Sequence, residues 1–299
     1  MIRHSSSGKT LRGLNIGILL CDRSNPFWVE NARKYEELAS SFGFHGDMVF
    51  PEPEGNPDSQ LNEMRRMLER GYDALVINPL TATNLVPAIL KASKKGIPVF
   101  DVGGKSRLES GCESPRMYVP VHTVDFYEQG RIGGEYLARL MEKNGESVAA
   151  IIGGRPGTVH SDKRCQGAEE AIKGHGKSVV VKSAYFERER AREIVCTLLE
   201  EQAELGAFFC ANDMMALGAA DVCSLRGVCA SIVGVDGIPE AIDAVRHGII
   251  SGTVAFSPRS VACCAAMAMA AFFDGKPCRH PDGIGSFLVS GDNIGSCGL

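Results

Sequence analysis

Residues 14–28, LNIGILLCDRSNPFW, pass from an apolar run through a turn into the start of an amphipathic stretch. The run Leu14–Leu20 is typical of a strand buried in a parallel sheet, and Asn25-Pro26 is a helix-start signal. A loop that leads from a parallel strand into a helix lies at the carboxyl edge of its sheet, where open α/β sheets bind ligands. The stretch therefore predicts an α/β fold with a ligand site in this loop.

Two interpretations apply to Phe27 and to Trp28, which is the only tryptophan of the chain. Flat apolar rings beside Asn25 and Arg23 suit a sugar, whose ring faces present C–H groups and whose edges present hydroxyls. Alternatively, both rings are the first core residues of an amphipathic helix. This segment alone does not decide between them.

Apolar runs and amphipathic stretches alternate for nearly the whole length of the chain. This pattern predicts two similar α/β halves in tandem, each a doubly wound parallel sheet. No Pro-, Ser- or Gly-rich linker separates the halves, which favours several short crossings between two domains over one flexible tether. The first half has predicted strands at 14–20, 46–50, 74–78, 98–102 and 117–121 with helices at 27–41, 59–70 and 84–95; the second has strands at 148–152, 179–186, 207–211 and 232–235 with helices at 125–143, 162–173, 188–201 and 214–225.

Composition excludes several classes of partner. A net charge of −4 and a pI near 6.0 give no general attraction to nucleic acid or to an anionic membrane. No apolar window is long enough for a membrane span, and Met1–Arg12 lacks the apolar core of a secretion signal. We therefore expect either a cytoplasmic protein or one whose signal has been removed. The odd number of cysteines, eleven, argues against a complete disulfide framework and against an oxidising compartment.

Polar residues recur where the predicted strands end. Each one has a simpler explanation, because Asn and Asp are favoured helix caps and turn formers. Several at equivalent positions of the topology nevertheless indicate one binding site, in which carboxylates and amides bind hydroxyls and an arginine supplies a fork of donors. These residues are Asn25, Asp101, Arg164, Asn212 and Asp236.

Catalytic and metal-binding signatures are weak. The seven histidines form no pair with the spacing of metal ligands on one helix face. His160-Ser161-Asp162 has the residue types of a hydrolase triad, but adjacent side chains rarely point at one another. Gly153–Gly157 follows a strand, yet it matches neither the dinucleotide fingerprint nor the P-loop. We therefore expect no enzyme, no metal and no cofactor.

Six segments resemble, in family order, the periplasmic sugar-binding proteins of ABC transporters, of the ribose-binding type. The resemblance implies a type I periplasmic binding protein fold in which two domains close over a sugar. It also implies a membrane permease as partner, a periplasmic location and a monomer. It places Asn25, Phe27 and Trp28 at the sugar from the first domain and Arg164, Phe186, Asn212 and Asp236 from the second. The segments are 25–28, 73–79, 96–99, 129–138, 212–219 and 233–237.

The same resemblance implies a hinge of three crossings, near 122–125, 255–258 and 288–292. The expected N-terminal domain is therefore 1–123 plus 257–289, and the expected C-terminal domain is 124–256 plus 290–299.

Two departures from the family pattern bear on the ligand. Ribose binders place an Asp-Arg pair where this chain has Gly103-Gly104, and a hinge glutamine where it has Phe256. We therefore expect a sugar other than ribose, a polyol or a cyclitol, with Asp101, Lys105 or Arg23 supplying the missing polar contacts. The basic residues Arg23, Lys105, Arg155, Arg164 and Arg188 leave a sugar acid open as well.

Two rival classes remain. The effector domain of LacI-type repressors shares this fold, but an intact repressor carries a helix-turn-helix headpiece first, and only a short polar stretch precedes Leu14. The sequence does not exclude a detached sensor domain of such a regulator, or a sensory receptor without its output domain. An enzyme acting on a sugar or nucleotide is disfavoured because no base, nucleophile or metal constellation is evident.

Overall fold

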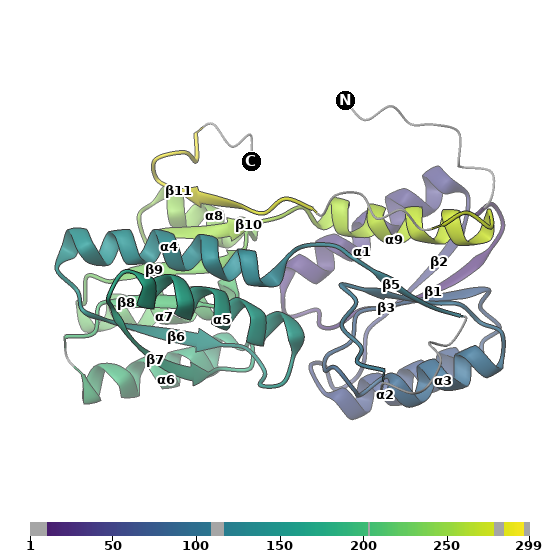
Figure 1. Ribbon diagram of the computed structural model, residues 1–299, viewed down its shortest axis with the longest axis horizontal. Helices are drawn as coiled ribbons and strands as arrows, with labels where there is room; N and C mark the ends of the chain where they lie inside the picture. Colours follow the sequence, from purple (N-terminus) through teal and green to yellow (C-terminus); the bar gives the residue numbers. More distant parts are fainter. Residues whose placement is uncertain (1–10, 109–116, 203, 278–283, 296–299) are drawn as a thin grey trace. The chain divides into compact units, whose positions relative to one another are not determined.

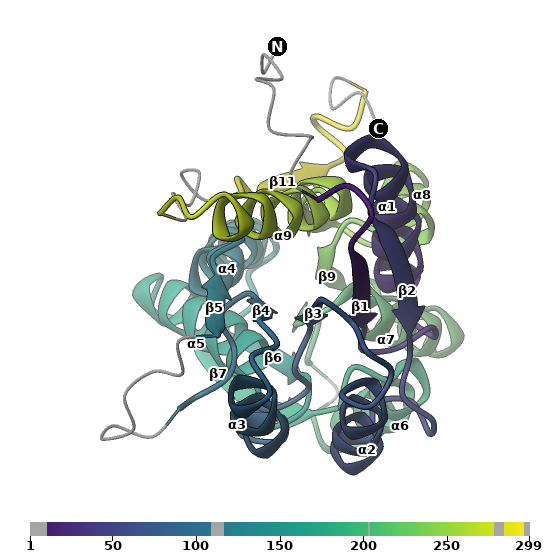
Figure 2. The ribbon, with the colours of Figure 1, turned by 90° about the vertical axis from the view of Figure 1, so that its right-hand side faces the viewer.

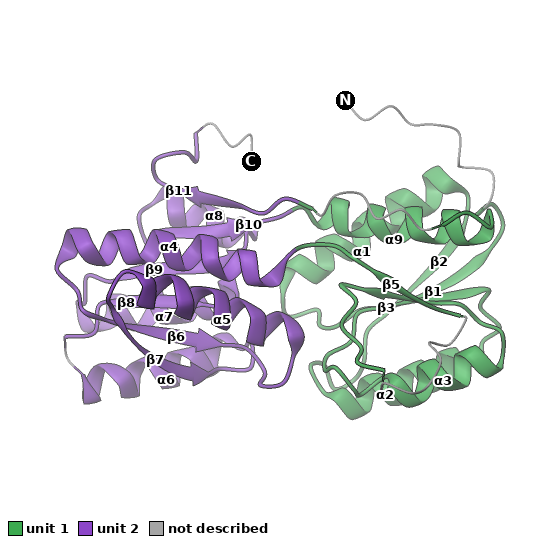
Figure 3. Ribbon diagram, viewed as in Figure 1, with its two compact units in different colours: residues 1–124, 257–284 green, residues 125–256, 285–299 purple. Residues whose placement is uncertain are grey.

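The computed structural model describes residues 11–108, 117–202, 204–277 and 284–295. These residues divide into two compact units, coloured separately in Figure 3. Unit 1 comprises residues 1–124 and 257–284, and unit 2 comprises residues 125–256 and 285–299. Each unit is built around its own sheet, as the alternating pattern predicts.

Unit 1 holds a parallel sheet of five strands in the order β2-β1-β3-β4-β5 (Figure 1). Figure 2 shows helices α1 and α9 on one face of this sheet and α2 and α3 on the other. The sheet is therefore doubly wound, and its central strands are buried on both faces, as parallel strands usually are. The elements are β1 Asn15–Leu19, α1 Pro26–Phe42, β2 His45–Val49, α2 Pro57–Met67, β3 Ala74–Ile77, α3 Val86–Lys94, β4 Val99–Val102, β5 Tyr118–Val121 and α9 Pro258–Phe273.

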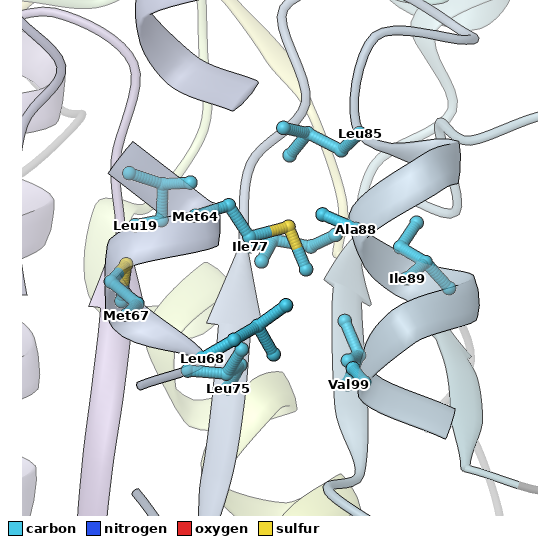
Figure 4. Close-up of a cluster of buried hydrophobic side chains, with 11 residues drawn as sticks. Leu19, Met64, Met67, Leu68, Leu75, Ile77, Leu85, Ala88, Ile89 and Val99 are labelled. Atoms are coloured by element: carbon cyan, nitrogen blue, oxygen red, sulfur yellow. The ribbon is translucent and has the colours of Figure 1, made fainter. Parts of the chain in front are cut away.

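One core cluster of unit 1 lies between the sheet and the helices α2 and α3 (Figure 4). Met64 and Met67 of α2 and Ala88 and Ile89 of α3 are at most 1% exposed and pack over β1, β3 and β4. Burial of a methionine or isoleucine side chain stabilises the unit by about 1.5–3 kcal/mol. This packing holds the carboxyl ends of the strands in fixed positions.

Unit 2 holds six strands in the order β11-β10-β9-β8-β6-β7, of which only β11 runs antiparallel to its neighbour. Helix α4 packs against α5, and α6 packs against α7. The elements are α4 Phe126–Asn144, β6 Val148–Gly153, α5 Val159–Gly174, β7 Ser178–Ser183, α6 Arg188–Glu201, β8 Ala207–Cys210, α7 Asp213–Arg226, β9 Ser231–Asp236, α8 Pro239–Arg246, β10 Gly252–Ala255 and β11 Phe287–Ser290.

The fold class is the predicted one, and the differences have local causes. Helix α1 begins at Pro26, one residue before the predicted start, so Phe27 and Trp28 lie in its first turn. Strand β7 ends at Ser183 instead of Phe186, because Tyr185 and Phe186 have φ values of 58° and 70°, which no strand accommodates. The predicted pattern also named no element after residue 235.

The third crossing differs in position from the expected one. The chain passes between units after Ile284, whereas the expected boundary follows residue 289. The reason is β11, which pairs with β10 from Gly252↔Ser290 to Ala255↔Phe287 and so belongs to unit 2. The first two divisions, after Val124 and after Phe256, fall within one residue of the expected ones.

Two glycines allow α4 and α5 to approach closely. A Cβ on Gly130 would lie 2.0 Å from the carbonyl oxygen of Arg164, and one on Gly167 would lie 2.1 Å from that of Tyr127. Both obstacles are backbone atoms, which cannot turn aside as a side chain can. The spacing of these helices therefore requires glycine at both positions.

We expect the Gly167→Ala substitution to lower the free energy of unfolding by about 1–3 kcal/mol or more, because the added methyl group must push the two helices apart. Gly174→Ala is the matched control in the same helix, since a Cβ there meets nothing within 4 Å. It should be neutral or slightly stabilising. Urea denaturation of both variants measures the difference, and equal stabilities would contradict the close-packing explanation.

Candidate functional site

The first turn of α1 carries the aromatic pair of unit 1. Asn25 caps this helix, because its side-chain oxygen accepts the N–H of Phe27 at 2.9 Å. The rings of Phe27 and Trp28 meet edge to face with centroids 5.2 Å apart. Phe27 is 5% exposed and belongs to the core, whereas Trp28 is only partly buried. The Lys105 ammonium lies 5.2 Å from the Trp28 ring centroid, within the range of a cation–π contact.

Asp101 is engaged within its own loop. Its Oδ1 accepts the N–H of Lys105 at 3.2 Å, and its Oδ2 accepts the N–H of Ser106 at 2.7 Å and the hydroxyl of Tyr118 at 2.8 Å. The side chain is completely buried, and Gly103 provides the left-handed turn, with φ of 88°, that brings the loop back over it. Burial, aided by this carboxylate, raises the pKa of Tyr118. Asp101 thus shapes the loop that carries Lys105.

Arg23 is held by the segment that follows β2. Its guanidinium lies 4.5 Å from the Phe50 ring centroid and forms ion pairs with Glu52 at 3.6 Å and Glu54 at 3.7 Å. More than half of the side chain is exposed. The expectation that Arg23 and Asp101 supply ligand contacts therefore gains no support from their surroundings, because Asp101 bonds within its own loop and Arg23 pairs with the segment after β2.

Asn78, which follows β3, is a residue that the sequence analysis did not select. It is completely buried, and neither polar atom of its side-chain amide has a hydrogen-bond partner within the part of the chain that the structure describes. Its backbone carbonyl, by contrast, accepts the Cys21 thiol at 3.1 Å and the Gln60 amide at 2.8 Å. An unsatisfied buried amide is costly, so this side chain is a candidate for a bond to an ordered water or to a ligand. The sequence feature that could have identified Asn78 is its position in segment 73–79, one of the six segments that resemble the family.

Arg164 is the centre of the polar cluster in unit 2. Its Nη1 lies 3.2 Å from Asp236 and also donates to the carbonyl of Ala211 at 2.7 Å, while its Nε donates to Gln129 at 2.8 Å. Both partners of the ion pair are 5% exposed. A buried charge pair needs further hydrogen bonds to offset its loss of hydration, and Gln129 and Ala211 accept two of them from Arg164.

Aromatic rings surround this cluster. The Arg164 guanidinium carbon lies 5.8 Å from the Phe126 centroid and 5.7 Å from the Phe256 centroid. The His160 and Phe186 rings stack with centroids 4.9 Å apart and planes 11° apart. We call Phe126, His160, Phe186 and Phe256 the aromatic cluster.

Asn212 connects the cluster to α7. Its side-chain oxygen accepts the N–H of Met215 at 3.0 Å, so it caps that helix, and its nitrogen donates to the carbonyl of Phe186 at 3.4 Å. The helix-cap explanation therefore applies to Asn212 as well as to Asn25.

Gly154 leaves room for the Phe186 ring of the aromatic cluster, because a Cβ there would lie 2.0 Å from that ring.

The structure thus brings together Phe27, Trp28 and Lys105 in unit 1, and Arg164, Phe186, Asn212, Asp236 and Phe256 in unit 2. It adds Phe126, Gln129 and His160, which lie in the first turns of α4 and α5. Arg164 lies in the second turn of α5 rather than at the end of a strand, where the sequence analysis placed it. Within the described ranges, no three His, Cys, Asp or Glu side chains could hold a metal ion.

Comparison with known proteins identifies the family. Residues 16–277 match the model of the periplasmic binding protein domain. The chain belongs to this family. The family resemblance inferred from the six segments is thereby confirmed.

Relatives of this family carry names that refer to sugars. The chain is 30% identical to the D-allose-binding periplasmic protein of Escherichia coli over 82% of its own length and 79% of that protein. It is 25% identical to the ribose import binding protein of Bacillus subtilis over 86% of its length and 80% of that protein. A solute-binding protein of an ABC transporter from Actinobacillus succinogenes, solved with D-allose, matches with a TM-score of 0.82 and 25% identity, covering 94% of this chain and 99% of that one.

Asp213, the first residue of α7, carries a completely buried carboxyl group. Its Oδ1 accepts the hydroxyl of Thr253 at 2.6 Å, and its Oδ2 accepts the N–H of Ile238 at 2.9 Å. Burial and then the negative charge of Asp236 raise the pKa of Asp213 to about 7. Because the folded state holds this proton more tightly than the unfolded chain, its stabilising contribution is lost as the pH rises.

We therefore expect the unfolding free energy of Asp213→Asn minus that of the wild type to increase as the pH rises from about 4 to about 7, and then to level off. The asparagine does not titrate, so the difference isolates this carboxyl group. Urea denaturation at several pH values measures it. A difference that does not change with pH would contradict the shifted pKa.

Proposed function

We propose that the protein is the solute-binding receptor of an ABC importer and binds a neutral sugar, polyol or cyclitol. The observation that carries the proposal is the Arg164–Asp236 pair, flanked by rings, where α5 meets the carboxyl end of β9. Planar polar groups beside aromatic faces match the alternating hydroxyl edges and C–H faces of a sugar. In this proposal the ligand also contacts Trp28 and Asn78 of unit 1.

The ion pairs favour a neutral ligand over a sugar acid. Arg164 is matched by Asp236, Arg23 by two glutamates, and Arg188 by Asp221 at 2.9 Å and Glu240 at 2.7 Å. An anionic ligand would have to compete with these carboxylates for their cations. Three of the five basic residues that left an acid open are thus neutralised by the protein itself.

A permease partner and a periplasmic location follow from the same proposal, since the D-allose relative is named as periplasmic. No helix in the described parts of the chain has the length and apolarity to span a membrane. The cysteines of the described residues all carry free thiols. In an oxidising compartment, burial would have to protect those that are buried, and burial does raise the pKa of Cys21 and Cys165 to about 11. Cys229, by contrast, is exposed.

A regulatory domain is the second candidate. The chain is 25% identical to the ribose operon repressor of Halalkalibacterium halodurans over 79% of its length, although it covers 65% of that protein. Light scattering at micromolar concentration separates the two candidates. A monomer with and without sugar supports the transport receptor, and a stable dimer favours the regulator.

We expect neutral sugars, polyols or cyclitols to change the intrinsic fluorescence, because Trp28 is the only tryptophan and is partly exposed. Titration across pentoses, hexoses, polyols, cyclitols and sugar acids identifies the ligand class. Calorimetry of Trp28→Phe, which keeps a ring, against Trp28→Ala tests whether the signal comes from contact. No fluorescence response and no thermal shift with any compound would contradict the proposed function.

We also expect the bound ligand to reduce the radius of gyration, because contacts from both units form only when the two units enclose it. Small-angle scattering with and without a saturating ligand from the fluorescence panel measures this change. The same ligand added to Arg164→Met, which cannot make the ion pair, should leave the radius unchanged at that concentration. An unaltered radius for the saturated wild-type protein would contradict closure.

A further inference from the structure

The aromatic cluster is placed where a ligand of Arg164 would meet it. Phe126 begins α4 and Phe256 follows β10, so the two rings that contact the guanidinium come from distant parts of the chain. Phe126 and Phe186 are partly exposed, and Phe256 is 8% exposed. Ala255 pairs with Asp236 in the sheet, which fixes the backbone of Phe256 beside the ion pair.

The polar groups at this edge are already engaged inside unit 2. The Nε and Nη1 atoms of Arg164 have protein partners, the Asp236 carboxylate pairs with Arg164, and the Asn212 oxygen caps α7. No described residue accepts a hydrogen bond from the Nη2 group of Arg164. Few donors and acceptors thus stand opposite a ligand here, compared with three phenylalanine rings.

A hydroxyl group pressed against a phenylalanine ring loses its hydrogen bonds to water and gains none from the ring edge. A methyl group in the same place gains from its burial. A fully hydroxylated sugar can lay a C–H face on one of the rings, but a hydroxyl that points at the second ring is left unsatisfied, whereas a methyl or methylene group in that place is not.

We propose that Phe126 and Phe256 are specificity-determining residues that select a neutral sugar or cyclitol with an apolar edge, a deoxy or O-methyl group in place of a hydroxyl. This inference rests on the proposed function and names its ligand class. Arg164 donates from Nη2 to a hydroxyl or ring oxygen of the ligand, and the apolar edge lies against the two rings.

The test uses pairs of compounds that differ at one such position: D-fucose and D-galactose, L-fucose and L-galactose, L-rhamnose and L-mannose, 6-deoxy-D-allose and D-allose, and pinitol and D-chiro-inositol. Calorimetry of the wild-type protein should show, in any pair that binds, roughly ten- to a hundredfold tighter binding of the deoxy or O-methyl member. A hydroxylated member that binds equally or more tightly in every binding pair would overturn the inference.

Phe256→Gln and Phe126→Gln each place an amide that can bond to the additional hydroxyl, so both should reduce the ratio about tenfold or reverse it. Phe287→Gln is the control, because Phe287 is a phenylalanine of the same unit that is 43% exposed on β11 and lies outside the aromatic cluster. If Phe256→Gln fails to fold, Phe126→Gln decides. Unchanged ratios in folded variants would overturn the role of these rings.

Binding of fully hydroxylated sugars without preference overturns the apolar-edge inference and leaves the receptor function standing. No binding of any compound, here or in the fluorescence panel, overturns both.

Discussion

The buried ion pair between Arg164 and Asp236 is the interaction on which the binding edge of unit 2 depends. Its partners come from α5 and β9, and Gln129 of α4 and the carbonyl of Ala211 after β8 accept further hydrogen bonds from the guanidinium. Removal of one charge would leave the other buried without compensation, which typically costs 3–5 kcal/mol. The pair therefore fixes how four elements meet where a ligand would approach.

This arrangement requires the close approach of α4 and α5. Arg164 and Gln129 lie on facing turns of the two helices, and Gly130 and Gly167 remove the side chains that would separate them. The glycines thus affect the site by letting α4 and α5 pack closely, and not by contacting the ion pair. In unit 1 the equivalent constraint is the loop after β4, which Asp101 holds in shape beneath Lys105.

Most of the helices and strands were predictable from the sequence, because buried parallel strands and amphipathic helices differ in the spacing of their apolar residues. Helix α9 was not, since PRSVACCAAMAMAAFF is small and apolar on nearly every face. The search for polar residues after the predicted strands found Arg164 and Asp236. The same search also selected Asp101, whose carboxylate instead accepts hydrogen bonds from the backbone of its own loop. The sequence could not separate Phe27, which is in the core, from Trp28. These distinctions depend on long-range contacts, which no local pattern encodes.

The central claim is that residues at the strand ends of both units bind one neutral sugar-like ligand. A crystal structure of the protein with the tightest-binding compound tests it most directly. The account predicts contacts from Trp28 and Asn78 of unit 1 and from Arg164 and Phe256 of unit 2 to the same molecule, with an apolar edge of the ligand against the Phe256 ring. A ligand bound away from these residues, or contacting one unit alone, would contradict it.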